Sequence, residues 1–266
     1  MREPFRATLL GCGNSTGVPA VGDFWGACDP AEPKNNRTRS SLALETENTT
    51  VIIDTGPDFR IQMNREAIKR VDAVLYTHAH SDHVSGMDEL RIIYFRNKTQ
   101  VPVYASKETF DDLYGRVPYL FNGGSHDIYP AVLAPHEIAP FQYGKPLHIG
   151  DFEIVPFLQD HGTCESLGYR MGDLAYSLDF IDLPDSAIEV LKGVHTWVVD
   201  CAAYHQTNNV VHANLERIYA LNQKIGAKMV YLSSLTLAMD YETLCRELPE
   251  GYAPAYDGLQ LVFGYV

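Results

Sequence analysis

Apolar residues recur along this chain with two different periods, either the short runs and alternation typical of strands or the spacing of three to four residues typical of helices. Stretches of the two kinds alternate. Short apolar or alternating runs predict β-strands in the first half at 7–10, 41–44, 50–54, 71–76 and 101–104. The same pattern predicts strands in the second half at 153–157, 167–170, 175–178, 196–200, 229–232 and 259–262. Helical spacing predicts helices at 57–68, 85–94, 107–114, 184–191 and 214–225. Strands interleaved with helices favour an α/β fold.

Two regions lack a regular period. Residues 22–39 are rich in Gly, Pro, Asn and Arg and predict an ordered surface loop. Residues 115–146 mix aromatic residues with Gly and Pro, and we expect a lid or substrate loop there. Because no linker or change in composition separates the two halves, the simplest interpretation is a single domain over residues 1–266, with two stacked sheets and helices outside.

Composition narrows the classes of partner. The net charge of -13 and a pI near 5.1 oppose binding to a nucleic-acid polymer, because neutralising phosphates requires clustered Lys and Arg. No apolar stretch approaches the roughly 20 residues of a membrane span, and the first residues do not resemble a signal peptide. We therefore expect a cytoplasmic protein with no membrane partner and a small substrate. Five widely spaced cysteines predict no disulfide framework.

The chemistry is concentrated in the turn that follows the strand at 71–76. His78, His80, Asp82 and His83 lie within six positions, and this spacing can aim the first two at one cation and the last two at another. Imidazole nitrogen and carboxylate oxygen suit divalent ions such as zinc or manganese. A polar loop with scattered histidines is the alternative, but a strand end is where α/β proteins usually place their sites. The turn therefore predicts a metal-dependent hydrolase.

A site for two metals needs more ligands than this turn supplies. His161 follows the strand at 153–157, and Asp179 follows the strand at 175–178. Each would be read alone as a solvated or capping residue. With the turn, His161 completes a set of three histidines, and the Asp179 carboxylate can bridge two cations.

The HxHxDH motif, His161 and Asp179 together resemble the metallo-beta-lactamase superfamily. That resemblance implies a four-layer αββα sandwich with up to two divalent metal ions, zinc or manganese. Residues 9–19, 53–56 and 252–266 resemble more closely the phosphoribosyl cyclic phosphodiesterases of phosphonate breakdown.

The resemblance also implies roles outside the metal ligands. Asp54 matches an aspartate that supports the histidine turn, consistent with a carboxylate fixing the tautomer of a ligating imidazole. His212 matches a histidine beside the substrate phosphate, and with Asp82 it is the expected catalytic residue. His205 is a rival for that role, and a surface position is the other interpretation of His212.

The chain departs from the family pattern at its last metal ligand. Ser234 stands where the family has a histidine after the strand at 229–232. A neutral hydroxyl is a poor ligand for these cations, so the second metal would keep only Asp82, His83 and the bridging Asp179. We expect weak occupancy of the second site and reduced activity.

The resulting hypothesis is a phosphodiesterase that hydrolyses a small cyclic or diester phosphate on a ribosyl or nucleotide group, with metal-bound hydroxide as the nucleophile. The replacement of the last histidine leaves open a weakly active or non-catalytic protein that binds nucleotide or phosphate. A transfer RNA 3′-processing endonuclease is a third interpretation, but the chain shows no basic, Gly-rich arm. A homodimer is implied by the resemblance alone.

Overall fold

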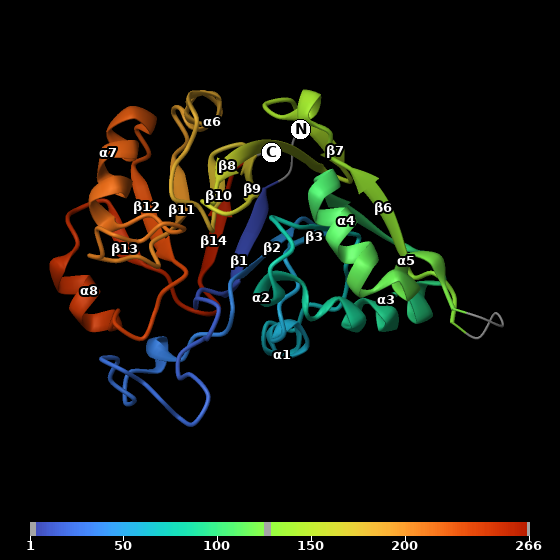
Figure 1. Ribbon diagram of the computed structural model, residues 1–266, viewed down its shortest axis with the longest axis horizontal. Helices are drawn as coiled ribbons and strands as arrows, with labels where there is room; N and C mark the ends of the chain where they lie inside the picture. The colour runs from blue at the N-terminus through green and yellow to red at the C-terminus, as the bar shows by residue number, and fades with distance from the viewer. Residues whose placement is uncertain (1–3, 125–128, 265–266) are drawn as a thin grey trace.

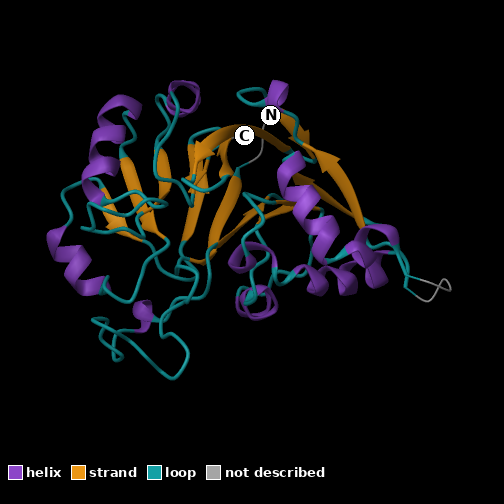
Figure 2. Ribbon diagram, in the orientation of Figure 1, coloured by secondary structure: helices purple, strands orange, loops and turns teal. Residues whose placement is uncertain are grey.

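Two β-sheets face each other, and helices cover the outer face of each (Figures 1 and 2). The computed structural model describes residues 4–124 and 129–264. Within these residues, each sheet has seven strands. Helix, sheet, sheet and helix form four layers, so the expected αββα sandwich is confirmed.

The first sheet has the strand order β14-β1-β2-β3-β4-β5-β6. Its members are β1 (Phe5–Gly11), β2 (Ser41–Glu45), β3 (Thr50–Ile53), β4 (Ala73–Leu75), β5 (Val101–Ala105), β6 (Leu133–Glu137) and β14 (Gln260–Phe263). Neighbours from β14 to β3 pair antiparallel, and neighbours from β3 to β6 pair parallel. The predicted hairpin is formed by β2 and β3, with Leu42 opposite Ile53.

The second sheet repeats this arrangement, with the order β13-β12-β11-β10-β9-β8-β7. Its members are β7 (Leu147–Ile149), β8 (Phe152–Asp160), β9 (Glu165–Met171), β10 (Leu174–Ser177), β11 (Thr196–Asp200), β12 (Met229–Ser233) and β13 (Tyr252–Pro254). Neighbours from β7 to β10 pair antiparallel, and neighbours from β10 to β13 pair parallel. Each sheet therefore has one antiparallel half and one parallel half.

The helices bury one face and expose the other. Over the first sheet lie α1 (Phe59–Arg65), α3 (Leu90–Asn97), α4 (Lys107–Arg116) and α5 (Pro118–Asn122). Over the second lie α6 (Asp185–Leu191), α7 (Leu215–Ile225) and α8 (Tyr241–Glu247). Single turns are formed by α2 (Ser81–Val84), η1 (Pro33–Asn35), η2 (Met87–Glu89) and η4 (Pro140–Gln142). In α7, Ile218, Leu221 and Ile225 are buried at helical spacing, and the Asn214 side chain caps the helix by accepting from the Arg217 amide.

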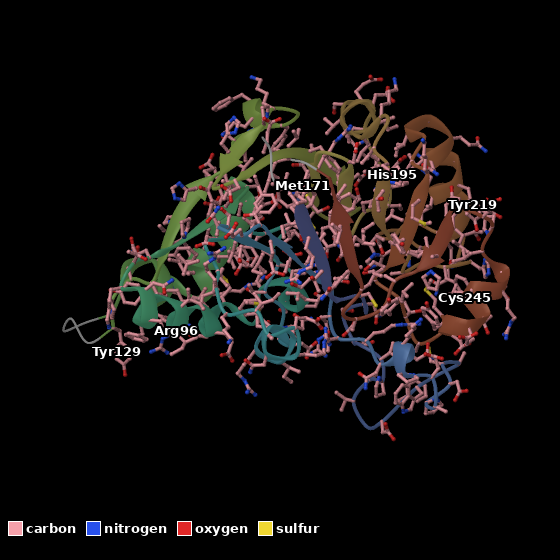
Figure 3. All side chains as sticks on the ribbon, turned by 180° about the vertical axis from the view of Figure 1, so that it is seen from behind. Arg96, Tyr129, Met171, His195, Tyr219 and Cys245 are labelled. Atoms are coloured by element: carbon pink, nitrogen blue, oxygen red, sulfur yellow. The ribbon has the colours of Figure 1, made fainter. Side chains whose placement is uncertain are left out.

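Two apolar cores hold the layers together. The larger lies between the sheets and against α6, α7 and α8, and it includes Leu9, Phe157 and Trp197. Met171 belongs to this core and lies among the packed side chains in Figure 3. The smaller lies between the first sheet and its helices and includes Phe110. Both faces of the first sheet are therefore buried, which explains why its parallel strands read as continuous apolar runs.

The structure corrects the prediction of an irregular lid at residues 115–146. Helix α5, strand β6 and turn η4 lie there, at an edge of the first sheet, and residues 125–128 lie outside the described part. Strand β6 was not recognisable because it is an edge strand that contains Pro135 and buries only Leu133 fully. The helix predicted at 85–94 is divided into the turn η2 and helix α3. Gly86, just before η2, packs so tightly that a Cβ would lie 2.2 Å from the Gly56 oxygen.

Within residues 4–124 and 129–264, no helix is long and apolar enough to cross a membrane.

Candidate metal centre

The candidate site lies where strands of both sheets end. Strand β4 leads into the turn with the four motif residues, β3 is followed by Asp54, β10 is closely followed by Asp179, and β12 by Ser234. Asp54, Asp179 and Ser234 all have positive φ, at 63°, 52° and 57°. Left-handed backbone costs free energy in residues other than glycine, and it is concentrated at functional sites.

The first group of ligand atoms comes from His78, His80, His161 and Asp179, which lie within 4.8 Å of one another. Nε2 of His78 lies 3.5 Å from Oδ2 of Asp179, and Nε2 of His161 lies 3.6 Å from the same oxygen. The structure thus brings together three histidines and one carboxylate that the sequence separates by up to 101 positions.

Hydrogen bonds hold two of these imidazoles with Nε2 directed inward. Nδ1 of His161 donates to the Val211 carbonyl at 2.8 Å. The Thr77 hydroxyl donates to Asp54 at 2.9 Å, so it accepts from Nδ1 of His78 at 3.0 Å. In each ring the proton is on Nδ1, and the Nε2 lone pair is directed at Asp179.

This arrangement fits a cation. Unprotonated imidazole nitrogens and carboxylate oxygens are all acceptors, and they repel one another unless positive charge lies between them. Within the described residues, Nε2 of His78 is buried without a hydrogen-bond partner. Buried polar atoms are rarely left unsatisfied, and three nitrogens with one carboxylate form a donor set suited to zinc or manganese.

The second group is formed by Asp82, His83 and the shared Asp179. Nε2 of His83 lies 3.3 Å from Oδ2 of each carboxylate. Its Nδ1 donates to Oδ2 of the fully buried Asp54 at 2.7 Å, which is the supporting contact expected for Asp54. Ser234 does reach the site, but its hydroxyl donates to Oδ1 of Asp179 at 3.4 Å. Only three strong ligands therefore surround the second position among the described residues.

The imidazoles of the two groups differ in their protonation without a metal. Burial, followed by the neighbouring His83, holds the pKa of His78 well below its usual range. Burial also lowers the pKa of His83, but Asp179 and Asp54 overcome this and raise it well above its usual range. A proton on His83 thus supplies the positive charge that a cation would supply at the second position.

His212 faces the same site from the second sheet. Its ring lies 5.2 Å from that of His161, and its Nδ1 donates to Oδ2 of Asp200 at 2.7 Å. Burial lowers the pKa of His212, but the Asp200 carboxylate overcomes this and raises it to about 9. Sequence reasoning assigned no role to Asp200. Its position at the end of β11, beside the end of β10 that Asp179 closely follows, is the signal that would have revealed it.

Members of both groups and His212 line one cavity of about 280 Å³. Its lining residues are Asn14, Ser15, His80, Asp82, His161, Asp179, Ala202, Gln206, Asn209, Val211, His212, Ser234 and Thr236. His205 is not among them. Its ring packs against Tyr204 with the centroids 3.9 Å apart, and its side chain is exposed. The structure therefore favours His212 over His205 as the histidine that faces a substrate.

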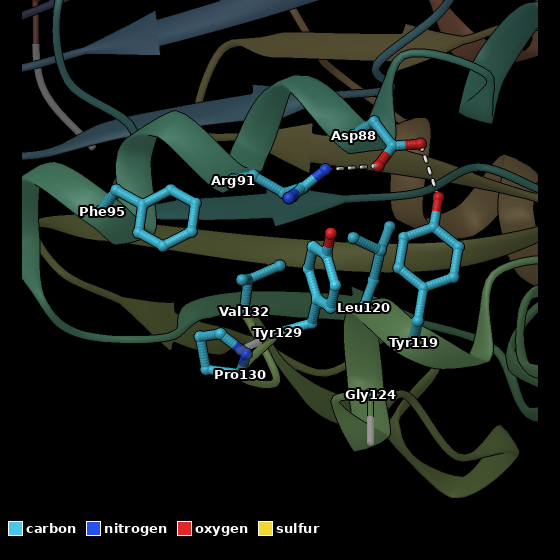
Figure 4. Close-up of a pocket in the computed structure, with 9 residues that line it drawn as sticks. All are labelled: Asp88, Arg91, Phe95, Tyr119, Leu120, Gly124, Tyr129, Pro130 and Val132. Atoms are coloured by element: carbon cyan, nitrogen blue, oxygen red, sulfur yellow. Dashed lines mark hydrogen bonds and ion pairs between the residues drawn. The ribbon is translucent and has the colours of Figure 1, made fainter. Parts of the chain in front are cut away.

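A larger cavity, of about 560 Å³, lies away from these ligands, between α3, α5 and the start of β6 (Figure 4). Its wall is mostly aromatic and aliphatic, and Tyr119 donates there to Asp88 at 2.6 Å. Three aromatic residues of the region 115–146, Tyr119, Phe121 and Tyr143, lie outside the cavity at the metal centre. Tyr119 lines this distant cavity, Phe121 is buried in the smaller core, and Tyr143 packs against the larger core.

Comparison with known proteins identifies the class. Residues 49–233 match the family model described as a beta-lactamase superfamily domain. The chain therefore belongs to the beta-lactamase superfamily and has the metallo-beta-lactamase fold. Within that class it belongs with the PhnP family. A structure described as a new diphosphatase from the PhnP family is 31% identical, covers 100% of this chain and 99% of its own, and superposes with a TM-score of 0.87.

The curated relatives are more varied. The octanoyltransferase of Porphyromonas gingivalis is 32% identical over 261 residues, which are 97% of this chain and 51% of that protein. The ribonuclease Z of Bradyrhizobium sp. (strain ORS 278) is 26% identical over 142 residues, 52% of this chain and 45% of that protein. The chain thus spans about half the length of these curated relatives. The fold and these neighbours support a hydrolase.

Proposed function

We propose that this protein is a metal-dependent phosphodiesterase that hydrolyses a small cyclic or diester phosphate carrying a ribosyl or nucleotide group. One observation carries the proposal. The cavity of about 280 Å³ is lined by ligands of both metal positions, His80, His161 and Asp179 for the first and Asp82 and Asp179 for the second, and by His212, whose Nδ1 donates to Asp200. A cavity of that size suits a compact ligand rather than a long polymer.

The charge of the cavity supports a diester. Among the described residues that line it there is no Lys or Arg, and His212 is the only side chain with a raised pKa and positive charge. A diester phosphate carries one negative charge, which bound cations and one imidazolium balance. A monoester or a diphosphate carries more negative charge, and enzymes for those substrates commonly bind it with additional Arg or Lys side chains.

The residues would divide the work as follows. His78, His80, His161 and Asp179 would hold one zinc or manganese ion, and Asp82 and His83 would share Asp179 in holding a second. Such ions supply positive charge beside phosphorus and activate water. His212 would bind the phosphate and donate its Nε2 proton to the departing oxygen, while the hydrogen bond to Asp200 keeps the other ring proton on Nδ1.

Two other substrates are raised by the relatives. The diphosphatase, similar over the whole chain, favours a diphosphate as the second candidate. The octanoyltransferase suggests a substrate that carries an acyl group. Among the lining residues only Ala202 and Val211 are apolar, whereas Asn14 and Gln206 carry carboxamides. Such a wall suits a sugar or a base better than an eight-carbon chain.

The test is a substrate panel on protein saturated with zinc or with manganese. It comprises bis(p-nitrophenyl) phosphate, ribosyl cyclic phosphates, nucleoside diphosphates, a transfer RNA precursor and an octanoyl thioester. We expect turnover of the diesters, loss of turnover in His78→Ala, and no loss in His148→Ala, which removes an exposed histidine outside the cavity. Nucleotide binding without turnover in any arm would favour a sensor and refute the proposal. Preferential cleavage of the RNA or the thioester would reassign the substrate.

We further propose a cytoplasmic protein that acts without a membrane or a nucleic-acid polymer, and a homodimer as its assembly. Light scattering coupled to size-exclusion chromatography tests the assembly directly.

A further inference from the structure

One short segment, residues 209–213, contacts the metal ligand His161 and carries the proton donor His212. It forms part of the cavity wall through Asn209, Val211 and His212. The segment contains neither a helix nor a strand, so no regular hydrogen-bond ladder fixes its conformation. Its shape must therefore come from particular contacts.

The side chain of Asn209 supplies the local contacts. Its Oδ1 accepts from the backbone amides of Val211, at 3.0 Å, and of His212, at 2.8 Å. Its Nδ2 donates to Oε1 of Gln206 at 3.4 Å. One carboxamide oxygen thus satisfies two consecutive amides and holds the backbone in a turn, as Asn side chains commonly do.

The turn that Asn209 stabilises is hydrogen-bonded to a ligand of the metal centre. The carbonyl of Val211 accepts from Nδ1 of His161 at 2.8 Å, which directs Nε2 of that ligand inward. The adjacent Gly162, with φ of +75°, packs so closely that a Cβ would lie 2.1 Å from the Val210 oxygen. The far end is held by the Ala213 amide, which donates to the Phe180 carbonyl at 2.7 Å.

We infer that Asn209 is a positioning residue that fixes the orientation of both the proton donor His212 and the metal ligand His161. Val211 provides the carbonyl that orients His161, and the next residue carries the imidazole that lines the cavity. Because both amides bind one oxygen, the two residues cannot move independently while that oxygen is present. Loss of the oxygen frees the segment and disturbs ligand and proton donor at once.

The test compares Asn209→Ala with Asn209→Asp and Asn208→Ala. The aspartate keeps an oxygen that accepts from both amides. Asn208 is the exposed neighbouring carboxamide outside the cavity and serves as the matched control. Zinc affinity is measured by competition with a chromophoric chelator, kcat and KM with bis(p-nitrophenyl) phosphate, and folding by thermal unfolding of the metal-free protein.

For Asn209→Ala we expect kcat to fall about 10-fold to 100-fold with a smaller change in KM, because a small displacement of a catalytic group costs that much. Zinc affinity should fall about 10-fold, in the range found when contacts that orient metal ligands are lost. Asn209→Asp should recover most of both losses, and Asn208→Ala should match the unaltered protein.

Two results would overturn the inference. One is an Asn209→Ala protein that equals Asn208→Ala in zinc affinity. The other is an Asn209→Ala protein that loses only thermal stability, or one whose losses of kcat and zinc affinity are not recovered in Asn209→Asp. Only the kinetic arm rests on the proposed function. If no phosphodiester is turned over, the zinc measurement still decides the inference, so the two failures remain distinguishable.

Discussion

Nδ1 of His212 donates to Oδ2 of Asp200 at 2.7 Å, and the carboxylate is completely buried at the end of β11. The other oxygen of Asp200 accepts from the Ala202 amide at 2.9 Å. Asp200 is therefore held in place by the backbone, and its carboxylate in turn keeps one proton of the His212 ring on Nδ1.

Asp200→Asn should reduce kcat for a phosphodiester about 100-fold or more, because the amide no longer favours the protonated imidazole and permits the other tautomer. The measurement is steady-state kinetics across a range of pH, with the exposed Asp185→Asn as control. Unchanged kcat in Asp200→Asn would show that the pair has no part in proton transfer.

The same pair predicts a dependence of stability on pH in the metal-free protein. The pKa of His212 is about 9 in the folded state, above the value of about 6.5 expected when unfolded. Protonation therefore favours folding. This contribution is fully present below about pH 6.5 and is lost as the pH rises to about 9. The difference in free energy of unfolding between the protein and His212→Gln, measured in urea, should shrink across that window. A constant difference would contradict the pKa. Bound cations nearby should move the window to lower pH.

Ser234→His should strengthen the second metal position. The serine hydroxyl now contacts Asp179 at 3.4 Å, whereas an imidazole from the same strand end would add a nitrogen ligand to the three strong ligands there. We expect the bound metal to rise toward two equivalents per chain, measured by mass spectrometry after gel filtration, and diester hydrolysis to rise with it. Ser186→His, on the exposed face of α6, is the control. Two tightly held equivalents in the unaltered protein would refute the idea that Ser234 limits the site.

Tyr119→Ala should leave diester hydrolysis within about twofold of the unaltered protein, since surface changes away from functional groups have small effects. Tyr119 belongs to the larger cavity between α3 and α5, together with Asp88 and Arg91, and none of these lines the cavity at the metal centre. The measurement is kcat/KM for the best diester of the panel. A large loss would mean that the substrate extends to that cavity.

The sequence alone predicts the layers well because most strands of both sheets are buried on at least one face and therefore read as apolar runs. Of the four edge strands in the described residues, it finds β14 but misses β6, β7 and β13. Strand β6 buries one residue fully, and β13 has a single fully buried residue, Pro254, so neither shows a strand pattern. Helix α3 begins at Leu90, after the turn η2, and the tight packing of Gly86 before that turn is not revealed by any local pattern.

For the site, the clustered turn and the two strand-end residues His161 and Asp179 were predictable, because strand ends of such sheets converge. The structure brings these side chains together, and their role in binding metal stays a prediction. The partners that orient them were harder to find. Val211 acts through its carbonyl and Thr77 through a hydroxyl, and residue type alone marks neither. Asp200 was missed because one carboxylate at a strand end carries no motif.

The Asp54 carboxylate supports a final prediction. It accepts from Nδ1 of His83 at 2.7 Å and from the Thr77 amide at 2.9 Å, entirely out of contact with solvent. Asp54→Asn keeps the shape but removes the charge that favours a basic, correctly oriented His83. We expect affinity for the second metal ion to fall about 10-fold to 100-fold, more than affinity for the first. Isothermal titration with zinc separates the two binding events, and the exposed Asp173→Asn provides the control. Equal losses at both positions would show that Asp54 stabilises the turn as a whole rather than orienting His83.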